Sequence, residues 1–369
     1  MKILYLTNLP SPYRVEFFNE LVRCGIDVTV LFERKNAENR EEKWISEEKF
    51  LFHGIYLKSL KIGNENALAL DALKYIKKND YDLIIIGGYS TITSMFCIEY
   101  MKIKKIPFVI NADGGIISQD SWFKKKLKDH FIGSAIAWLS SSPITTNYLV
   151  HYGAKRENVY EFPFSSIKKE DIEEPLNENS KKELQKKMHL SEEKTILYVG
   201  QFIYRKGIDV LLNSVRKMHA VKTNVLLVGG CVTEEIKKFV NDYNLKNIYF
   251  FPFKSKNELK PFYKVADVFV LPTRYDIWGL VVNEAVGFGL PVVSTERCVA
   301  AQTMIESGVN GFICKSEDSD GLAEKISILL NDDTKRNAFA KKNIEIAKEY
   351  TIESMAKRHL EIFNKILDG

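Results

Sequence analysis

Short runs rich in β-branched and aromatic residues alternate with longer segments of helical periodicity along most of the chain. Such alternation is typical of βαβ units, in which helices cover a parallel sheet. In the first half, helices such as Val15–Cys24 and Leu68–Lys77 are expected between strands at Ile3–Asn8, Asp27–Phe32, Leu83–Gly87, Phe108–Asn111, Ala137–Ser140 and Asn158–Phe162.

The second half repeats this pattern after a change in composition. Residues 166–194 are highly charged and poor in aromatics, which favours an interdomain linker containing a short amphipathic helix. A long helix is expected at Ile352–Leu367, after strands at Thr195–Val199, Val225–Val228, Ile248–Phe251, Val268–Leu271, Pro291–Ser294 and Gly311–Cys314.

We therefore expect an α/β protein of two doubly wound, Rossmann-like domains, residues 1–165 and 195–350, facing each other across a cleft. Residues 351–369 are expected to form a C-terminal helix that crosses back to the first domain. A length of 369 residues suits two domains of similar size.

Composition narrows the class of protein. With 45% hydrophobic and 27% charged residues the chain is typical of soluble globular proteins. The apolar runs are too short to span a bilayer, and Met1 leads directly into a strand, so a cytoplasmic location is expected. A net charge of +5 does not suggest nucleic-acid binding. The five scattered cysteines are expected to be reduced core residues, neither disulfides nor zinc ligands.

The stretch "VGQFIYRKG" places a basic pair where a strand ends. The strand ending at Val199 continues through Gly200 into a loop, and a helix follows from Gly207. Such a loop lies at the carboxyl edge of the sheet, where α/β proteins bind ligands. Arg205 and Lys206 could meet an anion there. A surface turn with two solvated charges is the alternative.

A second stretch, "PTRYDIWGLVVNEAVGFGLPVV", follows the strand Val268–Leu271. Gly279 precedes an apolar run that begins a helix, and the N-terminal amides around Gly279–Val281 offer a diphosphate site that needs no metal. Glu284, displaced along this helix, could accept hydrogen bonds from ribose hydroxyls, and Asp276 could accept them from a sugar. The alternative is a capped helix with one solvated glutamate.

Together the two stretches resemble the retaining glycosyltransferases of the GT-B fold, family 4 or glycosyl transferases group 1, of the bacterial surface-polysaccharide type. Gly200, Lys206 and Gly207 match that family's Gly-Arg-Leu-x-x-x-Lys-Gly loop, and Asp276 and Glu284 match its two acidic residues. The segments "ELKPFYKVADVFVLPT", "GVNGFIC" and "LPSPYRVEFFNEL" extend the resemblance over nearly the whole chain.

The resemblance implies an enzyme that moves a sugar from a nucleotide-diphosphate sugar to a saccharide acceptor, lipid-linked, in capsule, exopolysaccharide or lipopolysaccharide assembly. Lys206 would bind the diphosphate, Glu284 the ribose and Asp276 the transferred sugar. The donor site would lie in the second domain and comprise Gly200, Gln201, Arg205, Lys206, Phe253, Asp276, Trp278, Gly279, Leu280, Val281 and Glu284.

Two positions depart from the family pattern. Gln201 replaces the loop arginine and carries no charge, for which Arg205 could compensate, although adjacent side chains in an extended loop usually diverge. Asp276 is one methylene shorter than the family's glutamate. These departures leave the donor preference open.

The first domain would bind the acceptor. Asp113 stands in a loop where the family often has a histidine, and with Lys206, Asp276 and Glu284 it completes the set of expected catalytic residues, although an Asp-Gly turn is the alternative. The acceptor side is expected to comprise Tyr13, Arg14, Gly87, Gly88, Asn111, Asp113 and Gly114.

No metal and no cofactor are expected. The Asp-x-Asp motif Asp80–Asp82 stands where the chain enters a buried strand, a place at which aspartates cap backbone amides. None of the six histidines lies in a candidate loop, so none is assigned a catalytic role.

The stretch "SWFKKKLKDHF" interleaves aromatic residues with lysines at helical spacing. Residues Trp122–Phe131 could lie on an anionic membrane as a basic amphipathic helix at the inner face of the plasma membrane. The alternative is an ordinary surface helix whose aromatics belong to the core.

The sequence leaves two other functions open and disfavours a third. A GT-B nucleotide-sugar epimerase and a non-enzymatic nucleotide-sugar-binding protein both stay open, the second because of the departures at Gln201 and Asp276. A nicotinamide-dependent oxidoreductase is disfavoured because "NLPSPYRV" follows the first strand without a Gly-x-Gly-x-x-Gly pattern.

Overall fold

The computed structural model describes residues 1–35, 49–62, 66–218 and 222–369, which form two compact units. Unit 1 consists of Met1–Ser165 together with Thr351–Gly369, and unit 2 of Ser166–Tyr350. His219 lies outside the described residues. No helix in the described ranges is both long and apolar enough to cross a membrane.

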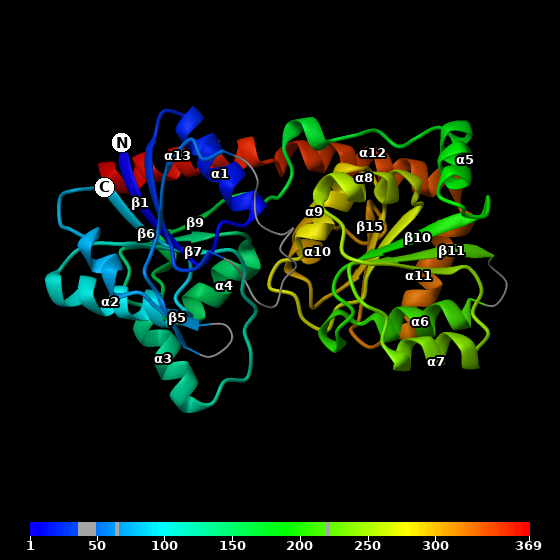
Figure 1. Cartoon of the computed structure of the whole chain (residues 1–369), viewed down its shortest axis with the longest axis horizontal. Helices are drawn as coiled ribbons and strands as arrows, with labels where there is room; N and C mark the ends of the chain where they lie inside the picture. The colour runs from blue at the N-terminus through cyan, green and yellow to red at the C-terminus, as the bar shows by residue number, and fades with distance from the viewer. Residues whose placement is uncertain (36–48, 63–65, 219–221) are drawn as a thin grey trace. The chain divides into compact units, whose positions relative to one another are not determined.

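Unit 1 is built on a seven-stranded parallel sheet of order β3-β2-β1-β6-β7-β8-β9. From β1 the chain winds first through β2 and β3 and then, in the opposite direction, through β6 to β9 (Figure 1). The strands are β1 (Lys2–Thr7), β2 (Asp27–Phe32), β3 (His53–Tyr56), β6 (Leu83–Ile86), β7 (Val109–Ala112), β8 (Ala137–Ser140) and β9 (Val159–Glu161).

The helices of unit 1 come from both ends of the chain. The C-terminal helix α13 (Ile352–Asp368) packs against α1 (Pro12–Arg23), the first helix. The others are α2 (Ile92–Lys104), α3 (Trp122–Ile132), α4 (Pro143–His151) and the short 3₁₀ turns η2 (Leu70–Lys74) and η3 (Arg156–Asn158). An antiparallel pair, β4 (Leu60–Ile62) and β5 (Asn66–Leu68), precedes η2.

Unit 2 is built on a six-stranded parallel sheet of order β12-β11-β10-β13-β14-β15. Its strands are β10 (Lys194–Val199), β11 (Thr223–Val228), β12 (Ile248–Phe251), β13 (Val268–Leu271), β14 (Val292–Thr295) and β15 (Gly311–Cys314). Its helices are α5 (Glu178–Lys187), α6 (Ile208–Lys217), α7 (Glu234–Asp242), α8 (Lys256–Val265), α9 (Leu280–Gly287), α10 (Val299–Met304), α11 (Ser319–Asn331) and α12 (Asp333–Glu349), with 3₁₀ turns η4 (Lys169–Asp171) and η5 (Tyr204–Lys206).

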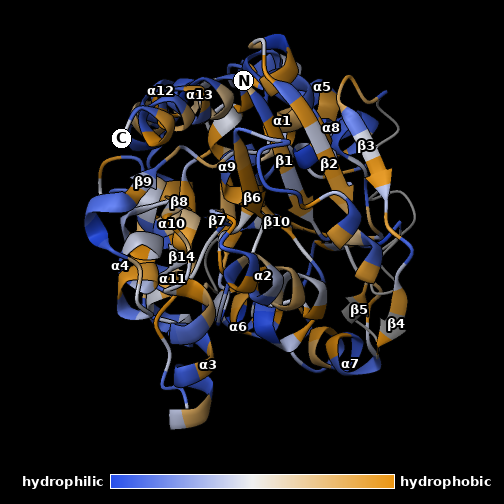
Figure 2. Cartoon of the chain, turned by 90° about the vertical axis from the view of Figure 1, so that its left-hand side faces the viewer, coloured by the Kyte–Doolittle hydropathy of each residue, from blue (hydrophilic) through white to orange (hydrophobic). Residues whose placement is uncertain are grey.

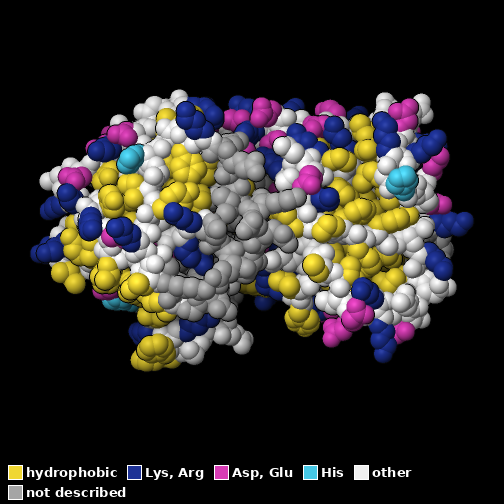
Figure 3. Space-filling model, in the orientation of Figure 1, with side chains coloured by type: hydrophobic (Ala, Val, Ile, Leu, Met, Phe, Trp, Pro, Cys, Tyr) yellow, Lys and Arg dark blue, Asp and Glu magenta, His cyan; other side chains and the backbone are white. Residues whose placement is uncertain are grey.

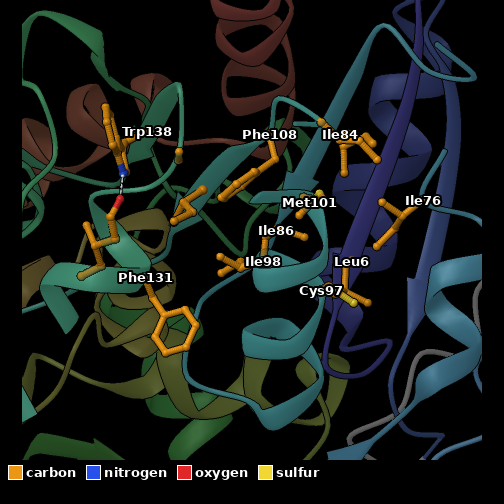
Figure 4. Packing of buried hydrophobic residues seen from close by; sticks show 14 of the residues in the cluster. Leu6, Ile76, Ile84, Ile86, Cys97, Ile98, Met101, Phe108, Phe131 and Trp138 are labelled. Carbon is orange, nitrogen blue, oxygen red and sulfur yellow. Dashed lines mark hydrogen bonds between the residues drawn. The ribbon is translucent and has the colours of Figure 1, made fainter. Parts of the chain in front are cut away.

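Both sheets are buried on two faces, which explains their continuous apolar runs. In unit 1, strand residues such as Leu6 and Ile86 pack against Cys97 and Met101 of α2 (Figure 4). The indole of Trp138, which is almost fully buried, donates to the carbonyl of Ile132 at 2.8 Å. Interior strands such as β6 are largely orange in Figure 2, as expected for a hydrophobic core. The expected fold class, two doubly wound α/β units, is confirmed.

The helix expected at Leu68–Lys77 is wrong. The segment ends β5 and continues as the 3₁₀ turn η2. Ala69, Ala72 and Ile76 are its fully buried residues. The first two are three residues apart, a spacing that a 3₁₀ turn aligns on one side. Strand β3 and the β4–β5 pair were also missed, because these short strands lack a run of β-branched residues.

The segment expected as a linker packs as part of unit 2. Asp171 pairs with Lys256 of α8 at 2.7 Å, and the amide of Glu173 donates to the carbonyl of Gly287 at 3.0 Å. Further along, α5 is the short helix expected there, and it also packs against α8. These contacts hold the segment against α8 and α9.

The prediction that all five cysteines lie in the core is wrong for two of them. Cys97, Cys298 and Cys314 are buried, but Cys231 is exposed and Cys24 is half-buried. Cys231 follows Gly229 and Gly230 in the loop after β11, which the scattered spacing of the cysteines could not reveal. All five are free thiols.

Candidate functional site

The two candidate loops of unit 2 leave neighbouring strands. β10 and β13 pair in the middle of the sheet, and from them the chain winds outward in opposite directions. This is the switch point at which open α/β sheets bind their ligands, beyond the carboxyl ends of the strands. The loop after β10 contains η5 and leads into α6, and the loop after β13 leads into α9.

Glycine allows these loops to touch. Gly207, the residue before α6, has φ of +72°, and a Cβ atom there would lie 2.0 Å from the carbonyl oxygen of Pro272. No side chain fits at such a distance, so this approach requires glycine. The carbonyl of Arg205 then accepts hydrogen bonds at 2.9 Å from both the amide of Arg274 and the hydroxyl of Thr273.

The contact between the loops brings the predicted phosphate-binding lysine to the predicted sugar-binding acid. The ammonium of Lys206 donates to the Oδ2 atom of Asp276, and both side chains are largely buried. Arg205 lies beside them, with its guanidinium 4.0 Å from the other carboxylate oxygen and bonded to the carbonyl of Tyr275 at 2.7 Å. The two basic side chains therefore converge on Asp276, because η5 is a 3₁₀ turn and not an extended loop.

The backbone around Asp276 is fixed by the chain after β14. Its amide donates to Arg297 at 2.9 Å, and its carbonyl accepts from Val299 at 3.2 Å. Gly279, with φ of +105°, lies so close that an added Cβ would be 2.7 Å from the Sγ of Cys298 and 3.7 Å from the Oδ2 of Asp276. Asp276 is therefore held next to the N-terminus of α9.

Helix α9 begins directly after Gly279, so the amides of Leu280 and Val281 belong to its first turn. Amides of a first helical turn have no acceptor within their own helix and carry a partial positive charge. Lys206 thus lies close to a helix N-terminus, and the combination of a cation with amide donors suits a diphosphate.

Glu284 lies one turn further along α9. Its Oε2 atom accepts a hydrogen bond at 2.7 Å from the hydroxyl of Tyr263, a buried residue of α8. Burial raises the pKa of Glu284, and the Tyr263 hydrogen bond and the charge of Lys256 oppose that rise. The Lys256 ammonium pairs with Asp171 at 2.7 Å, and the negative charge of Asp171 adds to the rise.

Arg274, which was not among the predicted site residues, joins three parts of the loop edge. Its guanidinium donates to the carbonyl of Tyr204 at 2.6 Å and lies 3.8 Å from the centre of the Tyr204 ring. The same group makes bidentate hydrogen bonds to Asp209, at 2.8 and 2.7 Å, and also pairs with Glu317. These hydrogen bonds raise the pKa of Arg274. Arg274 therefore anchors the turn that contains Lys206.

The other predicted donor residues lie at the same edge. Gly200 continues β10, and its amide donates to the carbonyl of Val228 at 2.8 Å. The carbonyl of Gln201 accepts from the buried Tyr198 hydroxyl at 2.9 Å, while its own side chain is exposed. Phe253, half-buried, follows β12. The indole of Trp278 is buried and donates to the side chain of Asn283 in α9 at 2.8 Å. This hydrogen bond stabilises the loop that leads into α9.

In unit 1 the structure brings three predicted acceptor-side residues together. Arg14 of α1 is buried and pairs with both carboxylate oxygens of Asp113 at 2.5 Å. The amide group of Asn111 donates to Asp113 at 2.8 Å, and Arg14 also donates to the hydroxyl of Tyr5 at 3.2 Å. Burial opposes the charge of Arg14, but the ion pair with Asp113 outweighs it, so the pKa of Arg14 is raised.

The remaining acceptor-side residues surround this cluster only in part. Tyr13 packs edge-on against Phe164 and near the Arg14 guanidinium. Gly87 follows β6 and donates its amide to the carbonyl of Leu6 at 2.8 Å, and Gly88 has φ of +106°. Gly114 is half-buried and directly follows Asp113.

No group of three or more histidine, cysteine, aspartate or glutamate side chains is arranged to hold a metal ion within the described ranges. The Asp82 carboxylate accepts the backbone amide of Lys2 at 2.7 Å, a contact that fixes the start of β1. Cationic and amide groups, in contrast, are present where the two loops of unit 2 meet.

Sequence reasoning missed several polar residues. Around the candidate donor residues, Tyr263 donates to Glu284, the amide of Arg274 donates to the carbonyl of Arg205, and the charge of Lys256 acts on Glu284. In unit 1, the hydroxyl of Tyr5 accepts a hydrogen bond from Arg14. Glu33, buried after β2, accepts hydrogen bonds from Thr91 and Ser94 at the start of α2. The basic residue in "TRYD" was a usable signal for Arg274. The others have partners distant in sequence and no motif of their own.

Comparison with known proteins adds independent findings. Residues 179–346 match the family described as Glycosyl transferases group 1. An uncharacterized glycosyltransferase of Methanocaldococcus jannaschii is 27% identical over 173 residues, which cover 47% of this chain and 48% of that protein. The chain thus spans about half the length of that relative. The N,N'-diacetylbacillosaminyl-diphospho-undecaprenol alpha-1,3-N-acetylgalactosaminyltransferase of Campylobacter jejuni is 24% identical over 307 residues, 80% of each chain.

Solved structures resemble the whole chain. HepE of Anabaena in complex with UDP has a TM-score of 0.80 at 17% identity, covering 99% of this chain and 100% of that one. Sucrose-phosphate synthase of Thermosynechococcus elongatus has a TM-score of 0.77 at 19% identity, covering 100% and 99%. At these identities the likeness concerns the fold, and it confirms the fold expected from the two motifs.

Proposed function

We propose that the chain, whose residues 179–346 match the family described as Glycosyl transferases group 1, transfers a sugar from a nucleotide-diphosphate sugar to a saccharide acceptor. The observation that carries the proposal is the convergence of Lys206 and Asp276 beside the N-terminus of α9. The two residues come from loops that follow neighbouring strands, at the switch point of the sheet.

The donor would bind with its diphosphate at Lys206 and the first amides of α9. Breaking the bond between the sugar and the diphosphate places negative charge on the leaving group, and fixed donors stabilise that charge without reorganising. Asp276 holds Lys206 in place and offers its second oxygen to the sugar hydroxyls. Glu284, one turn along α9, would accept hydrogen bonds from the ribose.

We also propose that the reaction needs no metal ion. The support is chemical: an ammonium, a nearby guanidinium and helix-terminal amides together supply the positive charge that a diphosphate leaving group requires. The proposal further includes retention of the anomeric configuration, with the acceptor proton passing to a donor phosphate oxygen. No separate general base is then required.

Unit 1 would take the acceptor. Both oxygens of Asp113 are engaged by Arg14, and this fixes the carboxylate so that its remaining lone pairs can accept from a sugar hydroxyl. A relative that acts on a diphospho-undecaprenol-linked sugar supports a lipid-linked acceptor. We therefore propose a role in bacterial surface-polysaccharide assembly, and a location at the inner face of the plasma membrane.

Release of nucleoside diphosphate from a panel of UDP-, GDP-, dTDP- and ADP-sugars tests this function. The assay is run with lipid-linked saccharide acceptors, with and without EDTA, and the product linkage is assigned by NMR. We expect acceptor-dependent release from one nucleotide family, insensitive to EDTA, with the donor configuration kept in the product. If the donor binds but is neither cleaved nor epimerised, the result would favour a nucleotide-sugar-binding protein. If the donor is epimerised without an acceptor, the result would favour an epimerase.

A further inference from the structure

Helix α3 presents its large apolar side chains outward. Trp122 is 74% exposed, Phe123 70% and Leu127 39%. With about 100° between successive residues of a helix, these three positions share one face with Lys126 and His130. Figures 1 and 2 show α3 extending from the rest of unit 1, and Figure 3 shows hydrophobic and basic side chains together at that end.

The opposite face of α3 holds the helix to unit 1. Phe131 and Ile132 are buried in the core. Lys128 pairs at 2.6 Å with Asp120, whose carboxylate also accepts the Tyr152 hydroxyl, and the ammonium of Lys128 lies 4.4 Å from the centre of the Tyr152 ring. The exposure of Trp122 and Phe123 therefore results from a fixed orientation of α3.

The charge around this face is basic. Lys126 is exposed on it and makes no ion pair within the described part of the chain. Lys124, at the same end of α3 but on the side of Phe131 and Lys128, is exposed and pairs with Asp120 at 3.0 Å. At the other end of α3, His130 contacts Lys102 of α2 at 2.8 Å and pairs with Glu99, so that end is neutralised. The free basic charge thus lies next to Trp122 and Phe123.

We propose that this face, Trp122, Phe123, Lys126 and Leu127, docks on an anionic lipid surface. Aromatic rings at the level of the headgroups and lysines that meet anionic lipids are the chemistry of interfacial helices. A protein partner or a second copy fits less well, because three apolar side chains on a projecting helix end cover far less than the roughly 800 Å² per partner of a stable interface.

Docking there would bring the membrane near the acceptor loop. Trp122 follows Asp113 by nine positions, so the two lie within about 30 Å of each other even along an extended chain. The inference deepens the proposed function by giving a surface for its inner-face location. Lipid binding is measured without any sugar transfer, so the two proposals can fail separately.

The test is co-sedimentation of the full chain with vesicles of phosphatidylcholine alone and with about one third phosphatidylglycerol. We expect binding to the anionic vesicles only. Trp122→Ser with Phe123→Ser should weaken it about tenfold or more, because both rings lose their contact with the interface. Lys126→Glu should weaken it at least fivefold, since each basic residue near an anionic surface contributes about that factor.

Matched controls are Leu367→Ser, an exposed apolar residue of α13, and Lys186→Glu, an exposed lysine of α5. Both should bind vesicles as the unsubstituted chain does. Equal binding by the Trp122 and Phe123 double variant, or no binding of the unsubstituted chain to anionic vesicles, would overturn the proposal. An oligomer that dissociates in the double variant, seen by light scattering, would assign the face to a second copy and overturn it too.

Discussion

At the scale of single residues, Glu284 should make nucleotide binding sensitive to pH. In the proposed site its ionised carboxylate would accept hydrogen bonds from the ribose hydroxyls, and burial raises its pKa. Below that pKa the group is protonated and loses acceptor capacity, so affinity should fall as the pH falls. Tyr263→Phe removes a hydrogen bond that lowers the pKa of Glu284, so the fall in affinity should begin at a higher pH.

Isothermal titration of the preferred nucleoside diphosphate across pH checks this prediction. The Phe ring keeps the stacking on Phe288, whose ring is parallel to that of Tyr263 at 5.1 Å, so affinity at high pH should change little. Glu284→Gln serves as the control, because it should remove the acid dependence altogether. An unchanged pH profile in Tyr263→Phe would show that Glu284 does not contact the nucleotide.

His359 should make unit 1 less stable in acid. It is buried among Phe17, Phe162 and Phe363, and burial lowers its pKa from 6.5 to about 3. The folded chain therefore binds fewer protons than the unfolded chain between these values. The stability from neutral His359 is complete above pH 6.5 and is lost as the pH falls toward 3, about 2 kcal/mol by pH 5.

His359→Phe removes this titration. Thermal unfolding of both chains at pH 7.5 and pH 5 gives two melting shifts to compare, and the shift caused by acid should be smaller in the variant. Because the change in melting temperature between the two pH values is compared within each chain, any effect of the substitution on packing that does not depend on pH cancels. An identical acid shift in both chains would mean that other groups account for the acid sensitivity.

Sequence reasoning found the residues that belong to local motifs. Lys206, Asp276 and Glu284 have recognisable neighbours in the chain, and the structure brings the first two into contact. It missed Tyr263 and Arg274, whose partners lie 21 and 65 residues away in sequence. Such contacts depend on which helices and loops become neighbours in the sheet, and no spacing within one sequence records that.

At the scale of elements, the start of α9 depends on a glycine. Gly279→Ala would place a methyl group 2.7 Å from the Sγ of Cys298 and force a side chain into a left-handed conformation. We expect a loss of about 1–3 kcal/mol of unfolding free energy and a large loss of nucleotide affinity. Urea unfolding and titration measure the two effects.

The matched control adds Cys298→Ala to Gly279→Ala. The smaller residue relieves the clash but leaves the backbone strain, so stability should recover in part. Full affinity in Gly279→Ala alone would contradict the placement of the diphosphate at the first turn of α9.

Arg274 should act as a positioning residue for η5. Arg274→Lys keeps a charge but loses the bidentate contact with Asp209 and the planar contact with Tyr204. The turn that contains Lys206 then loses its anchor. We expect affinity for the nucleoside diphosphate to fall about tenfold, while affinity for the nucleoside without phosphates stays unchanged.

The ratio of the two affinities separates positioning from general damage. A loss of structure would weaken both ligands equally, and that outcome would contradict the role assigned to Arg274. Lys264→Met is a suitable control, because its ion pair with Glu173 lies on α8 and not on the loop edge.

Elements were predictable where periodicity was strong. All six strands of the unit 2 sheet were expected within one or two residues, because each is a short run rich in apolar residues. The segment Leu68–Lys77 failed because apolar residues spaced three or four apart fit a 3₁₀ turn as well as an α-helix. The structure adopts the 3₁₀ turn, in which Ala69 and Ala72 are both buried.

At the scale of the whole molecule, the chain builds two sheets of the same kind and differs in how each is completed. Unit 2 is one continuous segment, whereas unit 1 needs α13 from the C-terminal end of the chain. In each sheet there is a point from which the chain winds outward in opposite directions, and the candidate site residues follow strands on both sides of it. These strands are β10 and β13 in unit 2, and β1 and β7 in unit 1. The fold therefore assembles both candidate sites from residues far apart in sequence.

In the proposed donor site, unit 2 holds the diphosphate of a nucleotide through Lys206 and the first turn of α9. The most direct measurement is titration of UDP, GDP, dTDP and ADP into the full chain, into Lys206→Met and into the exposed-lysine control Lys237→Met. We predict that one nucleotide binds, that Lys206→Met weakens it about 10- to 100-fold, and that the control leaves it unchanged. Equal affinity in all three chains would mean that Lys206 does not bind the diphosphate.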